Sequence, residues 1–314
     1  HALFAIAGRV DPTGDASACT NAQEDFETQA RTGNAIFRIP TPVFGGGLIE
    51  QIPDAAILAN ASAQTARKAK LGIGGRPNHV RVAGSANHSG NDGTVARFGW
   101  KAQNKSLLLF AGEAYNVEMG ISNEVFPTER DETASCQLAA VPNDTTDPDG
   151  TSAAAVMSSV ERFAFFMRFA APPSASSDAP GGAASIASGK GLFQSVGCAL
   201  CHTPSLRTGD ARVAALRARD VPLYSDLLLH HMGPGLADEI VQGDADGDEF
   251  RTAPLWGLGQ RLFFLHDGRA SDLVQAIREH RSGSDGRFSP SEANGVVGRF
   301  DALSPAQEQD LLNF

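Results

Sequence analysis

The most specific arrangement of reactive side chains in this sequence is a pair of cysteines followed directly by a histidine: Cys198, Cys201 and His202. Two thiols at this spacing can add across the two vinyl groups of one porphyrin, and the adjacent histidine can then bind the iron. A zinc knuckle would need a second pair of ligands that is not found here, and a thioredoxin-like redox motif needs no trailing histidine. The motif therefore predicts a covalently attached c-type haem with His202 as an axial ligand.

The second axial ligand of such a haem is less well defined. His280 is a candidate on a helix predicted over residues 270–281. Its rivals are His230, His231 and Met232, which are consecutive in the sequence. A histidine on a helix face is more often a polar surface residue than a ligand. The residues alone therefore leave the choice between His280 and its rivals open.

A second group of possible ligands is an acidic loop over residues 244–249. Asp244, Asp246 and Asp248 alternate along it and Glu249 follows, as in a short calcium-binding loop. The remainder of an EF-hand is absent. Calcium is therefore possible here, and a solvated acidic loop is the alternative.

The composition excludes some classes of partner. The 314 residues, of which 42% are hydrophobic and 20% charged, can build the cores of two domains. The formal net charge of -10 argues against broad affinity for nucleic acid or an anionic membrane. No apolar run reaches the length of about 20 residues that spans a bilayer. The nearest, residues 160–171, is interrupted by Arg162 and Arg168 and predicts a buried or amphipathic helix.

Two further cysteines, Cys19 and Cys136, are isolated in the sequence. They could form a disulfide, which would suit an oxidising compartment, or remain two free thiols. The chain begins at His1 inside an apolar run, so we expect it to be trimmed or processed.

A stretch rich in Ala, Ser, Pro and Gly over residues 170–189 predicts a flexible linker. It separates an N-terminal domain, residues 1–169, from a C-terminal domain, residues 190–314. In the second domain the pattern predicts four helices, over residues 190–196, 211–219, 270–281 and 305–314. A weak internal repeat relates residues 37–47 to residues 250–259, although such Gly- and Pro-rich segments can match by chance.

Several longer segments resemble a known family. YSDLLLH at 224–230, MGPGLAD at 232–238, RTAPLWGLG at 251–259 and the segment FFLHDGRASDLVQAIREH at 263–280 are similar to di-haem c-type oxidoreductases. GNAIFRIPTPVFGGGLIE at 33–50 agrees as well. These proteins, often labelled thiol oxidoreductases, are relatives of the bacterial di-haem cytochrome c peroxidases. The resemblance implies a mainly α fold with two cytochrome c-like domains, the first carrying added loops and short strands.

The resemblance also implies roles for particular residues. His280 stands where the relatives carry the second axial ligand, so it implies His202/His280 ligation of the iron. His266 and Arg269, in the His-Asp-Gly segment, would line the haem pocket or its propionates, and a structural turn is the alternative. Trp256 would contact the cofactor, and Trp100 or Trp256 could relay electrons, unless each is an ordinary core residue.

The sequence departs from the family in one respect, because it contains one CxxCH motif where two are expected. We expect one haem c in this chain and a second in a longer form of the protein, a true monohaem member being the alternative. Glu50 could then supply the acid or base that cleavage of a peroxide O–O bond needs, or be an ordinary exposed glutamate.

The resemblance implies a peroxidase-like enzyme that moves electrons through the C-terminal haem to a second haem. Its partners would be a small redox protein or cytochrome and hydrogen peroxide. A non-catalytic electron-transfer cytochrome c is the alternative, and a thiol oxidase is a third that no residue specifically supports. Since thioether attachment takes place outside the cytoplasm, we expect a periplasmic or exported bacterial protein.

Overall fold

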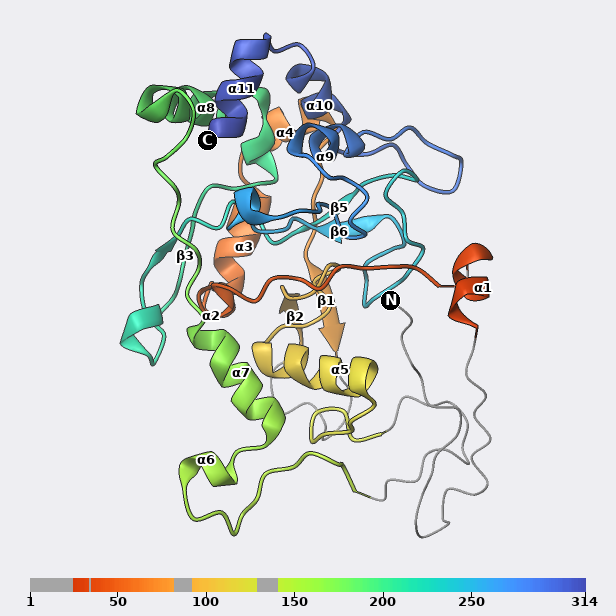
Figure 1. The fold of residues 1–314 in the computed structure, drawn as a ribbon, viewed down its shortest axis with the longest axis vertical. Helices are drawn as coiled ribbons and strands as arrows, with labels where there is room; N and C mark the ends of the chain where they lie inside the picture. The colour runs from red at the N-terminus through yellow and green to blue at the C-terminus, as the bar shows by residue number, and fades with distance from the viewer. Residues whose placement is uncertain (1–24, 34, 82–91, 129–140) are drawn as a thin grey trace. The chain divides into compact units, whose positions relative to one another are not determined.

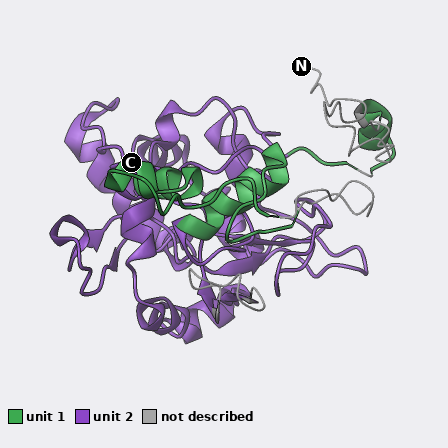
Figure 2. Cartoon of the chain, turned by 90° about the horizontal axis from the view of Figure 1, so that it is seen from below, with its two compact units in different colours: residues 1–37, 83–89, 108–165 green, residues 38–82, 90–107, 166–314 purple. Residues whose placement is uncertain are grey.

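The computed structural model describes residues 25–33, 35–81, 92–128 and 141–314. The chain forms two compact units, which are interleaved along the sequence (Figure 2). One comprises residues 1–37, 83–89 and 108–165, and the other comprises residues 38–82, 90–107 and 166–314. This division differs from a simple separation at residues 170–189, because the second unit includes segments from both halves of the sequence.

The first unit contains α1 (Phe26–Arg31), most of α5 (Leu107–Met119), α6 (Ala153–Val156) and the beginning of α7 (Ser159–Phe169). Its loops are held by buried polar side chains. The Asn123 amide donates to the Gly112 carbonyl oxygen, and its own oxygen accepts from the backbone N–H groups of Val125 and Phe126. Each polar atom of this asparagine is thereby satisfied, as burial requires.

The second unit contains short helices and three two-stranded antiparallel ladders among its described residues (Figure 1). Its helices are α2 (Gly46–Glu50), α3 (Asp54–Ala61), α4 (Thr65–Leu71), α8 (Gly182–Val196), α9 (Leu273–Glu279), α10 (Asn294–Phe300) and α11 (Pro305–Asn313). The ladders pair β1 (Asn78–Arg81) with β2 (Asp92–Ala96), β3 (Leu206–Arg207) with β4 (Asp220–Val221), and β5 (Leu229–His231) with β6 (Glu249–Arg251). The described fold is therefore mixed rather than mainly α, with helices and short strands as expected, and the two cytochrome c-like domains remain a prediction.

Three predicted helices are confirmed, namely α7, α9 and α11, and local capping explains the last two. The Asp272 carboxylate accepts from the Gln275 N–H at the start of α9. Ser304 and Gln307 form a reciprocal capping box at the start of α11, with Pro305 in the first turn. These signals lie within four residues of each helix start, so they act without help from distant segments.

A fourth predicted helix, over residues 190–196, is also present, and it begins earlier than expected, at Gly182 inside the predicted linker. The small residues of this added part pack against α11. One other expectation fails. The prediction of a helix over residues 211–219 was wrong. The segment contains only a short 3-10 turn, Ala214–Leu216, and joins β3 to β4. The Arg217 side chain donates to the Ala211 carbonyl and Ala218 has a left-handed φ of 49°, so the chain turns here.

The packing of α8 on α11 forms the principal helical contact of the second unit, and Figure 1 shows the two helices side by side. Their core contains Phe193, Val196, Phe300 and Leu311. Gly189 is the point of closest approach, since a Cβ atom there would lie 2.0 Å from the Asp310 carbonyl oxygen. Only glycine allows the two backbones to approach so closely.

We predict that Gly189→Ala lowers the free energy of unfolding by about 2 kcal/mol or more, because the added methyl group must push α11 away from α8. Gly191→Ala is the matched control, since an added Cβ there meets nothing within 4 Å. The free energy of unfolding of this control should rise by up to about 1 kcal/mol, because alanine has a higher helix propensity than glycine. Denaturant unfolding measures both, and equal stability of the two variants would contradict the close crossing.

No helix in the described part of the chain is long and apolar enough to cross a membrane.

Candidate functional site

The cysteine–histidine motif lies in a tight turn directly after α8. Gly197 ends the helix with a φ of +119°, a conformation that favours glycine, and residues Cys198–Leu200 then form one 3-10 turn. The backbone N–H groups of Cys201 and His202 both donate to the Cys198 carbonyl oxygen, at 3.3 and 2.9 Å. Both cysteines are free thiols, and burial raises the pKa of Cys198 to about 11. The motif therefore presents two unlinked, reduced sulfur atoms.

His202 has one ring nitrogen engaged and one available. Its Nδ1 lies 3.0 Å from the carbonyl oxygen of Tyr224. A carbonyl only accepts, so Nδ1 carries the hydrogen and Nε2 carries the lone pair that can bind a metal. Burial, and then the nearby His280, lower the pKa of His202 to about 4. The ring is thus a neutral imidazole whose orientation is fixed by a backbone carbonyl, as metal-binding histidines usually are.

His280 has the same arrangement. It caps the C-terminus of α9, and its Nδ1 lies 2.7 Å from the Ala276 carbonyl oxygen, so Nε2 again carries the lone pair. Burial lowers the pKa of His280 as well. His280 also contributes to the lowered pKa of His202, so the two rings influence each other electrostatically. The chemistry of this donor pair fits the two axial positions of a haem iron.

The rivals of His280 are engaged elsewhere. Both ring nitrogens of His230 face carboxylates: Nε2 lies 2.9 Å from Asp226 Oδ2 and Nδ1 lies 2.6 Å from Glu292 Oε2. His231 Nδ1 lies 3.0 Å from an oxygen of Asp248. Met232 is buried in a core cluster with Leu236 and Phe250. The identity of the second ligand remains a prediction. The described geometry favours His280, because its Nε2 keeps a lone pair that is available to a metal.

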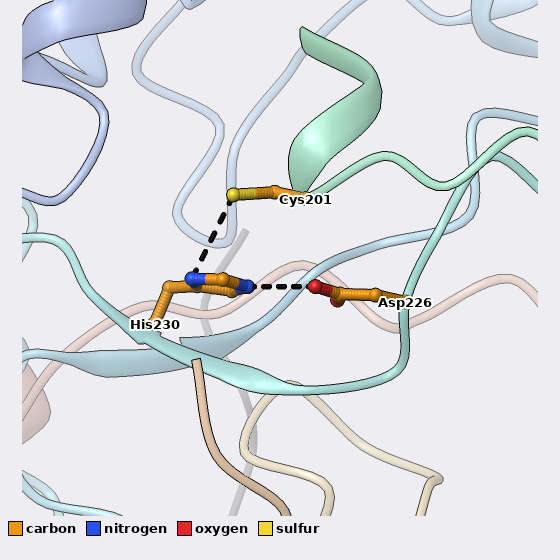
Figure 3. Close-up of side chains that lie close together, drawn as sticks. All are labelled: Cys201, Asp226 and His230. Carbon is orange, nitrogen blue, oxygen red and sulfur yellow. Dashed lines mark hydrogen bonds and ion pairs between the residues drawn. The ribbon is translucent and has the colours of Figure 1, made fainter. Parts of the chain in front are cut away.

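Cys201, Asp226 and His230 form one further cluster, which is drawn in Figure 3. Cys201 Sγ lies 3.7 Å from His230 Nδ1, and among the described residues this is the one group of three side chains that could hold a metal ion. The same sulfur atom is one of the two that would form thioether bonds to a haem. A metal ion and a thioether link at Cys201 therefore exclude each other.

His266 lies in an aromatic cluster distinct from the one around His202. Its ring stacks on Phe250 with centroids 4.3 Å apart, and it meets Trp100 in a T-shaped arrangement with centroids 6.3 Å apart. The ammonium group of Lys101 also lies over the Phe250 ring, 4.2 Å from its centroid. Burial lowers the pKa of His266 to about 4, so this ring is neutral. His202 instead contacts Phe193, whose centroid is 6.4 Å away.

Arg269 and Trp256 both have partners within the protein. The Arg269 side chain donates to Asp267 Oδ2, with Nε 2.6 Å away, and also to the Gly235 carbonyl oxygen. The Trp256 ring packs on Gly45, and its Nε1 donates to the Pro222 carbonyl oxygen at 2.7 Å. The contact between Gly45 and Trp256 joins the two segments of the weak internal repeat. The cofactor roles of Arg269 and Trp256 remain predictions.

Glu50 is held in a structural position. One carboxylate oxygen accepts from the Leu107 N–H at the start of α5, at 2.9 Å, and the other lies 2.6 Å from Arg168 Nε. Both carboxylate oxygens are thus occupied by donors of the protein itself. A role for Glu50 as an acid or base in peroxide cleavage remains a prediction that this pairing does not favour.

The acidic loop at 244–249 is likewise occupied by protein groups. Glu249 forms a two-pronged ion pair with Arg76, in which Nε lies 2.7 Å from Oε1, and Asp248 binds His231. Asp244 remains exposed at the surface. Calcium binding remains a prediction, and these carboxylates have other partners. The predicted pair Cys19 and Cys136 lies outside the described residues.

Three largely buried polar residues carry no mark in the sequence analysis above: Asp226 and Glu292, which bind His230, and Lys101, which lies against Phe250. Lys101 is fully buried and pairs with Asp238, their charged atoms lying 3.2 Å apart. Asp226 lies four residues before His230, a spacing that could have indicated a pair. No local signal marks Glu292, which is distant in sequence from its partner.

A model of one protein family, described as "Di-haem oxidoreductase, putative peroxidase", matches residues 1–303. No curated protein and no solved structure matched the chain.

Proposed function

The chain belongs to the di-haem oxidoreductase family, and from this premise we propose that it binds a c-type haem at Cys198, Cys201 and His202 and works in electron transfer. The family implies a haem cofactor and an oxidoreductase function. The attachment chemistry and the position of the haem are our own inference from the site.

One observation carries the proposal: two unbridged cysteines adjoin His202, and both His202 and His280 keep Nε2 unprotonated. His202 and His280 both direct the Nδ1 hydrogen to a backbone carbonyl, which leaves Nε2 as a ligand atom. The free thiols at Cys198 and Cys201 provide two attachment points at CxxC spacing. A bound haem would supply reversible one-electron chemistry at this place.

The surrounding residues fix the ligands and shield them in part from water. Phe193 packs edge-on against Tyr224 and Phe314, with centroids 5.7 and 5.5 Å away, and closes the site on the side of His202. Low access of water disfavours charge on the imidazoles, in agreement with the low pKa of His202. The site is therefore built to present neutral nitrogen ligands in an apolar setting, as in a cytochrome c-like domain.

If His202 and His280 both held the iron, no position would be left for hydrogen peroxide, and the haem would supply electron transfer. We propose that peroxide reduction in a longer form of the protein takes place at a second haem, to which this site passes electrons. A non-catalytic electron-transfer cytochrome c is the second candidate, which the pairing of Glu50 with Arg168 favours. In both cases a small redox protein or cytochrome is the partner, and a periplasmic or exported location is proposed.

The test is to produce the protein in a host with cytochrome c maturation and to record its mass and spectra. We expect the colour to survive acid–acetone extraction. We also expect the mass to increase by one haem for each CxxCH motif present. The ferric spectrum should be low-spin. A longer form that adds a high-spin component and reacts with hydrogen peroxide would identify the peroxidase, whereas an entirely low-spin protein inert to peroxide would identify the carrier. A colourless chain of unmodified mass would refute both.

A further inference from the structure

The orientation of His202 depends on a loop at residues 224–226. Three hydrogen bonds join this loop to the haem-binding motif. They run from His202 Nδ1 to the Tyr224 carbonyl (3.0 Å), from the Ser225 N–H to the Thr203 carbonyl (3.0 Å) and from the Asp226 N–H to the Cys201 carbonyl (2.9 Å). Any movement of the loop therefore moves the carbonyl that orients the imidazole.

The loop adopts a backbone conformation that is costly for its residues. Tyr224 and Leu227 have left-handed φ angles of 51° and 60°, which side chains other than glycine seldom adopt. Such strained conformations persist only where the surroundings hold them in place. The loop therefore needs an anchor outside itself.

The side chain of Asp226 supplies that anchor through His230. Asp226 Oδ2 lies 2.9 Å from His230 Nε2, and His230 Nδ1 lies 2.6 Å from Glu292 Oε2. Figure 3 shows the Asp226 half of this arrangement, with Cys201 on the opposite edge of the ring. We call Asp226, His230 and Glu292 the carboxylate clamp.

The charges of the clamp are complementary. Ionised carboxylates only accept hydrogen bonds, so both nitrogens of His230 donate and the ring is an imidazolium. The side chains of Asp226, His230 and Glu292 are only 0%, 4% and 12% exposed. An ion pair buried to this degree is strongly disrupted when one partner is removed.

The remaining contacts of the clamp fix its position. The Gly74 N–H donates to Glu292 Oε2 at 2.9 Å. Gly75, with a φ of +82°, lies against the His230 ring, where a Cβ would be 2.7 Å from Cε1. The clamp thus ties the loop at 224–226 to two segments that are distant in sequence.

We propose that the carboxylate clamp positions His202 through the Tyr224 carbonyl and thereby sets the reduction potential of the haem. This inference rests on the proposed function. His230 is accordingly a positioning residue and not a ligand. A firm Nδ1–H···O=C bond makes the imidazole a stronger donor, which stabilises ferric iron and lowers the potential. Loosening the clamp should therefore raise the potential.

His230→Gln is the decisive variant, because two explanations predict opposite signs. Removing a positive charge near the haem would by itself stabilise ferric iron and lower the potential. If the clamp acts through His202, the reduction potential rises instead. We expect the equilibrium constant for reduction to increase by about tenfold, which corresponds to about 59 mV for one electron. Redox titration measures this, and the electron paramagnetic resonance of the ferric protein reports the orientation of the axial imidazoles.

His231→Gln is the matched control. This histidine is the next residue along β5, pairs with Asp248 and makes no contact with the clamp through its side chain. Its potential and spectrum should equal those of the unaltered protein. Glu292→Gln provides a second test if His230→Gln does not fold, since it should alter the ferric resonance while the haem stays attached.

The positioning role of the clamp would be refuted if the reduction potential of His230→Gln were lowered or unchanged and the resonance of the axial imidazoles were unchanged in both clamp variants. This would hold even if the thermal stability of the variants fell. That result is distinct from failure of the proposed function, in which the unaltered protein itself would lack covalent haem.

Discussion

Protein in which Cys198 and Cys201 are both replaced by alanine should be purified without covalent haem, even from a host with cytochrome c maturation. Both sulfur atoms lie in the turn after α8 and neither is bridged to another cysteine, so removing them removes both attachment points. The loss should be essentially complete, and acid–acetone extraction, pyridine haemochrome spectra and intact mass all measure it.

Ser205→Ala is the control for this experiment, because Ser205 is an exposed small residue just beyond the motif. It should retain one haem per motif. Should the double alanine variant keep its added mass and its colour after extraction, the haem would be attached elsewhere and the account of this site would be wrong. Either single cysteine variant should keep one thioether link and a perturbed spectrum.

Replacing His280 with alanine should convert the haem from low-spin to high-spin, because the second axial nitrogen is lost. The neighbouring residues are poorly placed to substitute, since both nitrogens of His230 bind carboxylates and Met232 lies in a core cluster. The conversion should be nearly complete, and added imidazole should restore the low-spin spectrum by occupying the opened position. Absorption and electron paramagnetic resonance spectra measure both effects.

Met232→Leu distinguishes this assignment from its main rival. The substitution conserves volume and should leave the low-spin spectrum unchanged. If instead His280→Ala stayed low-spin and Met232→Leu became high-spin, methionine would be the ligand. The His280→Ala protein should also gain reactivity toward small ligands such as cyanide.

The parts of the site that could be predicted from the sequence are those determined by neighbouring residues. The haem-attachment motif needs two cysteines and a histidine within five residues, and its chemistry can be read directly. The starts of α9 and α11 follow from Asp272 and from Ser304 with Gln307, which cap the helices from inside the same segment. The role of His280 as the second axial ligand, which the resemblance implies, stays a prediction.

The parts that could not be predicted depend on contacts between distant segments. His230 is a plausible ligand in the sequence because nothing there shows that Glu292 lies against its ring. The first residues of α8 have the composition of a linker, and they become helical through contacts such as that of Ser185 with Asp310. The alanine-rich segment at 211–219 predicts a helix by propensity, which tertiary contacts overrode.

The crossing of α8 and α11 has a consequence for the order of assembly. As the chain is synthesised, α8 and the motif that follows it emerge well before α11, which supplies Leu311 to their shared core. Until that late helix arrives, Phe193 lacks its contacts with Leu311 and Phe314, although Tyr224 is already available. We therefore expect that attachment of the proposed haem is easier before α11 docks than afterwards.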